Sequence, residues 1–155
     1  MQNNWLLELI TNPFLLTALS SWAIAQVTKM IIHAIINKKL DIERLFGDGG
    51  MPSGHSATVA SLATISALAC GTGSFQFAVC AVLAIIVCHD ATGVRLETGK
   101  QAVVINEIID AFTVLTEKKL PEVKLKEFVG HSPIQVAAGI LIGIANGFLM
   151  YYVIL

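Results

Sequence analysis

Long apolar stretches without charged residues constrain this chain more than any other feature, because they suit a lipid bilayer better than a soluble core. Lys, Arg, Asp and Glu are absent from residues 13–28, and again after Lys29 as far as residue 36. They are also absent from residues 56–70, 75–88 and 131–155. A membrane-spanning helix needs about 20 apolar residues, with a range of about 17–25. The first and last stretches reach that length outright, and the middle two reach it with their polar ends.

We therefore expect an all-α fold, in which residues 1–155 form a single integral membrane domain. The expected bundle has four transmembrane helices, at about 13–36, 55–70, 75–94 and 133–155. Residues 101–120 differ, because apolar side chains recur there at helical spacing with Asn106, Glu107 and Asp110 between them. That pattern predicts an amphipathic helix on the cytoplasmic membrane surface.

The basic residues follow a one-sided distribution. They are Lys29, Lys38, Lys39, Arg44, Arg95, Lys100, Lys118, Lys119, Lys124 and Lys126. All lie near the end of the first helix, in the connection to the second, or between the third and fourth. The positive-inside rule therefore predicts a multi-pass protein of the cell inner (plasma) membrane, with both termini outside and these connections in the cytoplasm.

A glycine-rich loop opens the second helix on the cytoplasmic side. Residues 49–56 read Gly-Gly-Met-Pro-Ser-Gly-His-Ser. The unpaired N–H groups and positive dipole end of the helix after it attract anions. His55, in the first turn, is placed to exchange a proton with a bound phosphate. The alternative is an ordinary helix start capped by Ser53.

Further polar groups converge on the same membrane face. His131 opens the fourth helix in a second loop, Gly-His-Ser-Pro, and Asp90 and Arg95 close the third. Lys29 belongs to a polar stripe on the first helix; the alternative is that it only reaches up to the headgroups. For Asp90 and Arg95 the alternative is a local ion pair. Two histidines facing one anion site would serve phosphoryl transfer through a covalent intermediate.

Three segments carry a resemblance to a known superfamily. Residues 51–56, Met-Pro-Ser-Gly-His-Ser, resemble motif 2 of the type 2 phosphatidic acid phosphatase superfamily. Residues 130–139, Gly-His-Ser-Pro-Ile-Gln-Val-Ala-Ala-Gly, resemble the end of its motif 3. Residues 90–95, Asp-Ala-Thr-Gly-Val-Arg, with Gln-Ala at 101–102 and Asn106, are similar to its small, four-spanning divergent branch. The resemblance extends over nearly the whole chain.

The resemblance implies roles for matching residues. His131 falls at the position of the nucleophile, which would form a phosphohistidine, and His55 falls at the general acid/base position. Ser53 and the backbone of Gly54 would hold phosphate oxygens. Lys29 is the best match for the lysine of motif 1. The membrane members of the superfamily generally need no metal, so we expect neither a metal nor another cofactor.

Other positions depart from the superfamily pattern. Residues 36–37 lack the Arg-Pro of motif 1, and residues 124–125 lack the Ser-Arg of motif 3. Arg95 or Lys100 is the expected substitute. Gln135 stands where the superfamily has the acid that orients and charges the nucleophilic histidine. An amide there can orient the ring of His131 without charging it, and Asp90 is the alternative source of the carboxylate.

The expected function is that of a lipid phosphate phosphatase at the cytoplasmic leaflet. Candidate substrates are phosphatidylglycerol phosphate, phosphatidic acid and isoprenyl phosphates; we expect membrane lipids as surroundings and no nucleic-acid partner. One alternative is a catalytically weak or inactive phospholipid-headgroup binder or transporter, and another is a small membrane assembly subunit. Gly139, Gly143 and Gly147 form a small-residue ridge that predicts close helix packing, within the monomer or in a homodimer.

Overall fold

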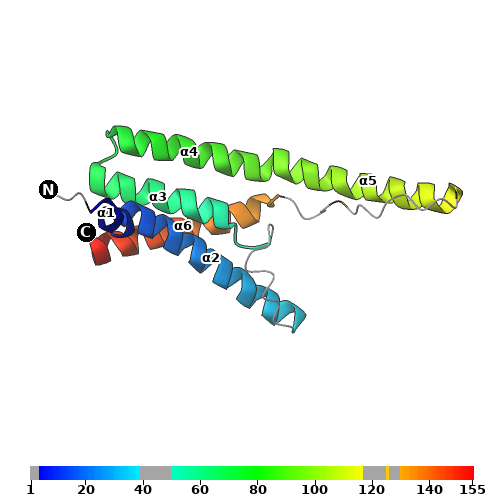
Figure 1. Cartoon of the computed structure of the whole chain (residues 1–155), viewed down its shortest axis with the longest axis horizontal. Coiled ribbons are helices and arrows are strands. Elements are labelled where there is room, and N and C mark those ends of the chain that lie inside the picture. Colours follow the sequence, from blue (N-terminus) through cyan, green and yellow to red (C-terminus); the bar gives the residue numbers. More distant parts are fainter. Residues whose placement is uncertain (1–3, 39–49, 117–124, 126–129) are drawn as a thin grey trace.

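The computed structural model describes residues 4–38, 50–116, 125 and 130–155. These residues form helices and loops with no strand, which confirms the all-α expectation for the described part of the chain. The helices are α1 (Trp5–Ile10), α2 (Pro13–Asn37), α3 (Gly54–Cys70), α4 (Phe75–Thr92), α5 (Val94–Thr116) and α6 (Pro133–Ile154). Figure 1 shows α2, α3, α4 and α6 side by side as a bundle, with α5 projecting beyond it.

Side-chain caps set where four of these helices begin. The Asn12 carboxamide oxygen accepts hydrogen bonds from two N–H groups at the start of α2. Ser53, Ser74 and Ser132 each cap the next helix by accepting a bond from the N–H three residues on. Such caps pair donors that would otherwise have no partner, and each contributes about 1 kcal/mol. The helix cap at Ser53, given above as the alternative to an anion site, is therefore present.

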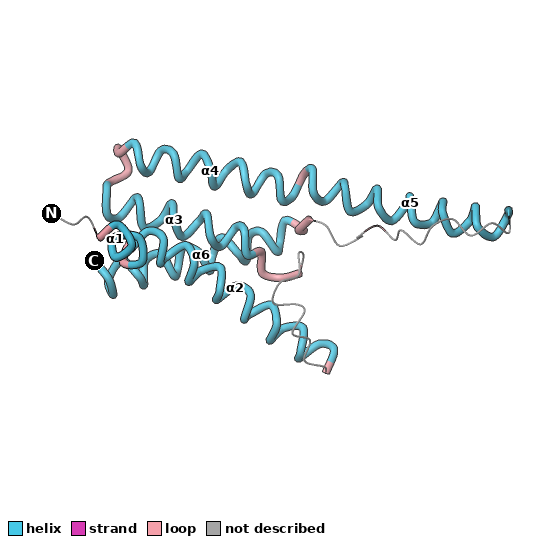
Figure 2. The backbone as a smooth tube through the Cα atoms, viewed as in Figure 1, coloured by secondary structure: helices cyan, strands magenta, loops and turns pink. Residues whose placement is uncertain are grey.

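Helix α3 lies at the centre of the bundle and contacts α2, α4 and α6, as the traces in Figure 2 illustrate. Its inward faces are lined by small side chains, including Ser56, Ala57, Ala60 and Ser61, all of which are buried. Small residues let neighbouring helices approach closely, and close approach maximises van der Waals contact inside a membrane. The core of the protein is therefore the α2–α3–α6 interface.

The glycine ridge of α6 packs against α3 within the same chain. A Cβ atom added at Gly139 would meet the backbone oxygen of Ser53, and one at Gly143 would lie 2.9 Å from the Ala60 Cβ. A Cβ at Gly147 would lie 2.7 Å from the Thr64 Cβ. All three glycines are buried in this contact. Packing within the monomer therefore accounts for the ridge. The contact with α3 leaves no room on these glycines for a second copy of the chain.

A polar cluster joins α6 to the first half of α2. The Asn146 amide nitrogen lies 2.7 Å from the Ser21 hydroxyl, 2.9 Å from the Ser20 hydroxyl and 3.2 Å from the Thr17 carbonyl oxygen. Hydrogen bonds of this kind between membrane helices contribute about 0.6 to 2 kcal/mol. The cluster therefore holds α2 and α6 together where both are buried.

Three helical runs are long and apolar enough to cross a membrane: α2, the α4–α5 run over Phe75–Leu115, and α6. Helix α3 is also apolar, but it has 17 residues. That number is at the lower limit of about 17–25 residues for a spanning helix. The expectation of four transmembrane helices is thus confirmed for three of them by length and composition.

The helix that contains residues 101–116 begins earlier than the sequence predicts, and residues 117–120 of the expected amphipathic helix lie outside the described residues. It was expected over about 101–120 as a separate element, but α5 starts at Val94, and Phe75–Leu115 forms one nearly straight run of 41 residues. Gly93 lies between α4 and α5, but the helical pattern of hydrogen bonds continues through it. The Gly93 N–H donates to the His89 carbonyl oxygen, and the Gly93 carbonyl oxygen accepts from the Glu97 N–H. At about 1.5 Å per residue this run is about 60 Å long, twice the ~30 Å hydrocarbon core. Its far half must therefore lie outside that core.

Candidate functional site

The loop before α3 is anchored to the start of α6. The Ser53 N–H donates to the Gln135 carbonyl oxygen at 3.0 Å, which ties the two helix N-termini together. The Ser53 hydroxyl is fully buried and accepts bonds from the Ser56 N–H and hydroxyl, at 3.3 and 3.0 Å. The contacts of Ser53 are therefore those of a helix cap. Two helix N-termini at one place concentrate positive dipole ends and unpaired N–H donors, which attracts anions.

A second loop positions His131 beside the end of α4. Gly130 has φ +105°, which favours glycine, and it lies directly against the backbone of Arg95 and Leu96, so a side chain there would collide with that backbone. The His131 N–H donates to the Ala91 carbonyl oxygen at 3.0 Å. His131 is only 3% exposed. The ring of His131 is thus fixed among α3, α4 and α6.

The two histidines face each other across the helix starts. The ring centroids of His55 and His131 are 6.1 Å apart, with the ring planes at 78°. His55 is exposed, whereas His131 is buried. An attacking atom sits about 3–3.5 Å from its target, and an acid about 2.6–3.2 Å from the atom it protonates. The two rings are therefore close neighbours at the converging helix starts, on the length scale of a group that both could contact.

Helix α2 forms the third wall of the site. Lys29 is buried, and a Cβ added at Gly50 would lie 3.4 Å from its Cδ, so its side chain runs along the loop before α3. Lys29 therefore lies along this loop rather than extending into bulk solvent, and its role in the site stays a prediction.

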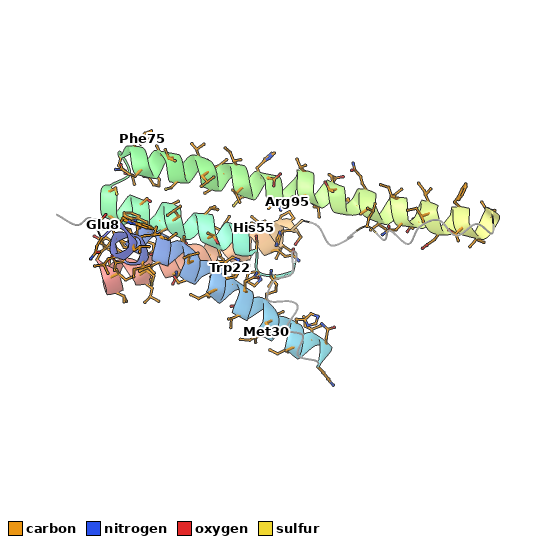
Figure 3. The ribbon with its side chains drawn as sticks, viewed as in Figure 1. Glu8, Trp22, Met30, His55, Phe75 and Arg95 are labelled. Atoms are coloured by element: carbon orange, nitrogen blue, oxygen red, sulfur yellow. The ribbon has the colours of Figure 1, made fainter. Side chains whose placement is uncertain are left out.

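Two further α2 side chains border the start of α3. Gln26 belongs to the same polar stripe as Lys29, whereas Trp22 carries no signal in the sequence that links it to the site. A Cβ added at Gly54 would lie 3.4 Å from the Trp22 ring and 3.9 Å from the Gln26 carboxamide carbon. Figure 3 shows Trp22 and His55 at the same level of the bundle. Gln26 is buried, and its Oε1 has no hydrogen-bond partner among the residues that the structure describes. An unpaired buried amide next to an anion-attracting helix start is suited to contact a ligand.

Gln135 has a different role from the one predicted. Its Oε1 accepts a hydrogen bond from the Ser132 N–H at 3.0 Å, and its own N–H donates to the Ser132 hydroxyl. These reciprocal bonds form a capping box. The carboxamide therefore completes the start of α6 instead of orienting the ring of His131. The spacing Ser-Pro-Ile-Gln could have indicated this, because Ser followed by Gln three residues later is the capping-box pattern.

We expect Gln135→Glu to change the rate of phosphate release by no more than about threefold, because a glutamate at this position of a capping box accepts the same bond from Ser132. Steady-state kinetics with purified protein would measure it, alongside thermal unfolding to verify the cap. A rise of tenfold or more would mean that the new carboxylate acts on His131, and would refute the capping assignment.

Asp90, Arg95 and Lys100 are placed less centrally than predicted. The Arg95 Nε donates to an Asp90 carboxylate oxygen at 2.7 Å, and both side chains are about half exposed. The local ion pair is thus the alternative that the structure displays, although Figure 3 shows Arg95 at the same end of the bundle as His55. Lys100 pairs with Glu97 at 2.7 Å on the exposed surface of α5. Since α5 contacts only α4 among the described helices, Lys100 does not reach the histidines.

Metal-binding residues do not cluster in the described part of the chain. No group of three or more His, Cys, Asp or Glu side chains is arranged there to hold a metal ion. The polar groups that the structure does gather are two imidazoles, one lysine, one buried amide and two helix N-termini. That set is chemically suited to bind a phosphate and to transfer protons at it.

Comparison with known proteins adds a family relationship. Residues 10–146 match a family described as the Divergent PAP2 family. The "Uncharacterized membrane protein YuiD" of Bacillus subtilis (strain 168) is 43% identical over 155 aligned residues, which cover 94% of this chain and 98% of the relative. No solved structure matches the chain. The matched range contains both histidines and all of the residues that surround them.

Proposed function

The chain belongs to the Divergent PAP2 family, and on that basis we propose that it is a membrane lipid phosphate phosphatase working through a phosphohistidine. The observation that carries this proposal is the pair His55 and His131, whose ring centroids lie 6.1 Å apart at two converging helix N-termini. The burial of His131 and the exposure of His55 suit two different roles. A protected ring serves as nucleophile, and a ring in contact with water serves as acid and then base.

The reaction would proceed in two steps. A ring nitrogen of His131 attacks phosphorus, the bond from phosphorus to the lipid oxygen breaks, and the leaving oxygen takes a proton from His55. His55 then accepts a proton from water, which attacks phosphorus and breaks the P–N bond, releasing inorganic phosphate. Lys29, Gln26 and the N–H groups at the start of α3 would stabilise the charge on the other phosphate oxygens.

The proposed site faces the cytoplasm. The end of α4 and the starts of α3 and α6 lie together at the histidines, beside Trp22 and Gln26 of α2. In the sequence, most of the basic residues belong to the connections that lead into α3 and α6. The positive-inside rule places such connections in the cytoplasm. Lipid phosphates of the inner leaflet, such as phosphatidylglycerol phosphate, phosphatidic acid or isoprenyl phosphates, are therefore the proposed substrates.

A second candidate function is the binding of phospholipid headgroups with little or no turnover. Two contacts favour it: Asp90 is engaged by Arg95, and Gln135 is engaged by Ser132. Both residues that were expected to assist His131 thus have other partners. Neither side chain therefore supports the charged form of the His131 ring in the way that the sequence suggests.

The two candidates differ in one assay. Purified protein in detergent would be given a panel of lipid phosphates, and inorganic phosphate would be measured with time. We expect release well above a protein-free control for at least one lipid. If the lipids bind, as followed by native mass spectrometry, but no phosphate is released from any of them, the headgroup-binding function replaces the enzymatic one.

A further inference from the structure

An apolar groove of about 500 Å³ lies between α3, α4 and α6. Alanines on α3 and α4 make much of its wall, and larger apolar side chains of α6 complete it. Its most polar lining group, the Thr64 hydroxyl, already donates to the Ala60 carbonyl oxygen at 2.8 Å. Because alanine side chains fill little space, the groove stays open, and it offers a ligand apolar surface with no polar group to pair.

The groove begins close to the histidines and runs away from them. On α4 its near end is lined by Cys88, which is about one helical turn from Ala91, the residue whose carbonyl accepts the His131 N–H. On α3 it is lined from Ala60 to Leu68. At about 1.5 Å per residue, those positions lie roughly 9 and 21 Å from the start of α3. The groove therefore runs from the neighbourhood of the histidines along α3 and α4 into the membrane-spanning part of the bundle.

We propose that this groove holds one hydrocarbon chain of the lipid whose phosphate lies between His55 and His131. The inference rests on the proposed function and adds to it a preference, set by the groove, for phosphate monoesters of long-chain lipid alcohols over esters with short chains. A phosphate held at the helix starts directs its attached chain into the ~30 Å hydrocarbon core, along these same helices. There the chain exchanges contacts with bilayer lipids for contacts with three helices, and the walls of the groove fix its direction relative to the phosphate.

Filling the groove should separate long-chain from short-chain substrates. Ala81 lines the groove, whereas Ala78, on the same helix, lies outside it on an exposed face. We expect Ala81→Phe to lower kcat/KM for dioleoyl phosphatidic acid about tenfold or more, because a displaced chain misplaces the phosphate. Its kcat/KM for dihexanoyl phosphatidic acid should stay near that of the wild type. Ala78→Phe should leave both values unchanged.

The kinetic outcomes distinguish this inference from the proposed function. If the wild type hydrolyses both lipids and Ala81→Phe affects them equally or not at all, the groove does not hold the chain, although the enzymatic function stands. If the wild type hydrolyses neither lipid, the proposed function fails, and a second measurement that requires no turnover decides about the groove.

That second measurement is photolabelling with phosphatidic acid bearing a diazirine near the end of one acyl chain. We expect label on the groove-lining residues of α3, α4 and α6 in the wild type, and at least a fivefold loss of that label in Ala81→Phe but not in Ala78→Phe. Equal labelling of all lipid-facing surfaces would mean ordinary bilayer lipid and would overturn the inference. If crosslinking shows that a second copy of the chain covers the groove and blocks its labelling, the inference is overturned as well.

Discussion

Replacing His131 with alanine should lower kcat for phosphate release from a lipid phosphate by about 10³-fold or more, because the covalent route loses its nucleophile. His131 is the buried member of the histidine pair, held by the bond from its N–H to the Ala91 carbonyl. Among the described residues no other histidine occupies an equivalent place, since His33 lies in the second half of α2 and His89 in the last turn of α4. Steady-state kinetics of the purified variant measures the effect.

A matched control separates loss of chemistry from loss of folding. His89→Ala removes an exposed imidazole from the end of α4 and should retain the wild-type rate. His131→Asn keeps a polar side chain in the buried position and should be as inactive as the alanine variant while unfolding at nearly the wild-type temperature. Substantial activity in a folded His131 variant would assign the nucleophile to another residue.

Replacing His55 with alanine should lower kcat for a lipid phosphate by about 10²–10⁴-fold, the usual contribution of a general acid or base. The deficit should depend on the leaving group. With p-nitrophenyl phosphate, whose leaving group needs no protonation, the first step should survive, while hydrolysis of the phosphohistidine should remain slow. Stopped-flow absorbance should then record a burst of about one nitrophenol per protein, as expected when a covalent intermediate accumulates.

The burst also provides the control for this variant. A double variant carrying His55→Ala and His131→Ala should show no burst, because it cannot form the intermediate. If His55→Ala alone reduces the burst as strongly as it reduces turnover of lipid phosphates, His55 acts in binding rather than in proton transfer.

Much of the fold follows from local signals in the sequence. The charge-free stretches predict α2, α4 and α6, and serine caps and prolines mark where the helices begin. The loops before α3 and α6 each bring a histidine to a helix start at the same end of the bundle, so the convergence of His55 and His131 is predictable from the order of the helices.

Other features depend on contacts between distant segments, which spacing cannot reveal. The ridge from Gly139 to Gly147 is compatible with a partner inside or outside the chain, and only the fit of these glycines against α3 decides between them. For Gln135 the sequence allows two roles: the capping box that the structure shows, and the orienting role suggested by its position four residues after His131. The place of Trp22 beside Gly54 results from how α2 crosses α3, for which the sequence carries no local signal.

The central claim is that phosphate passes through His131, and trapping the phosphorylated protein tests it most directly. The His55→Ala protein would be incubated with ³²P-labelled phosphatidic acid, quenched at alkaline pH to preserve the P–N bond, and digested for peptide mapping. We predict label approaching one phosphate per chain, confined to the peptide that contains His131. Release of phosphate by the wild type with no label at His131, or with label on another residue, would contradict the account.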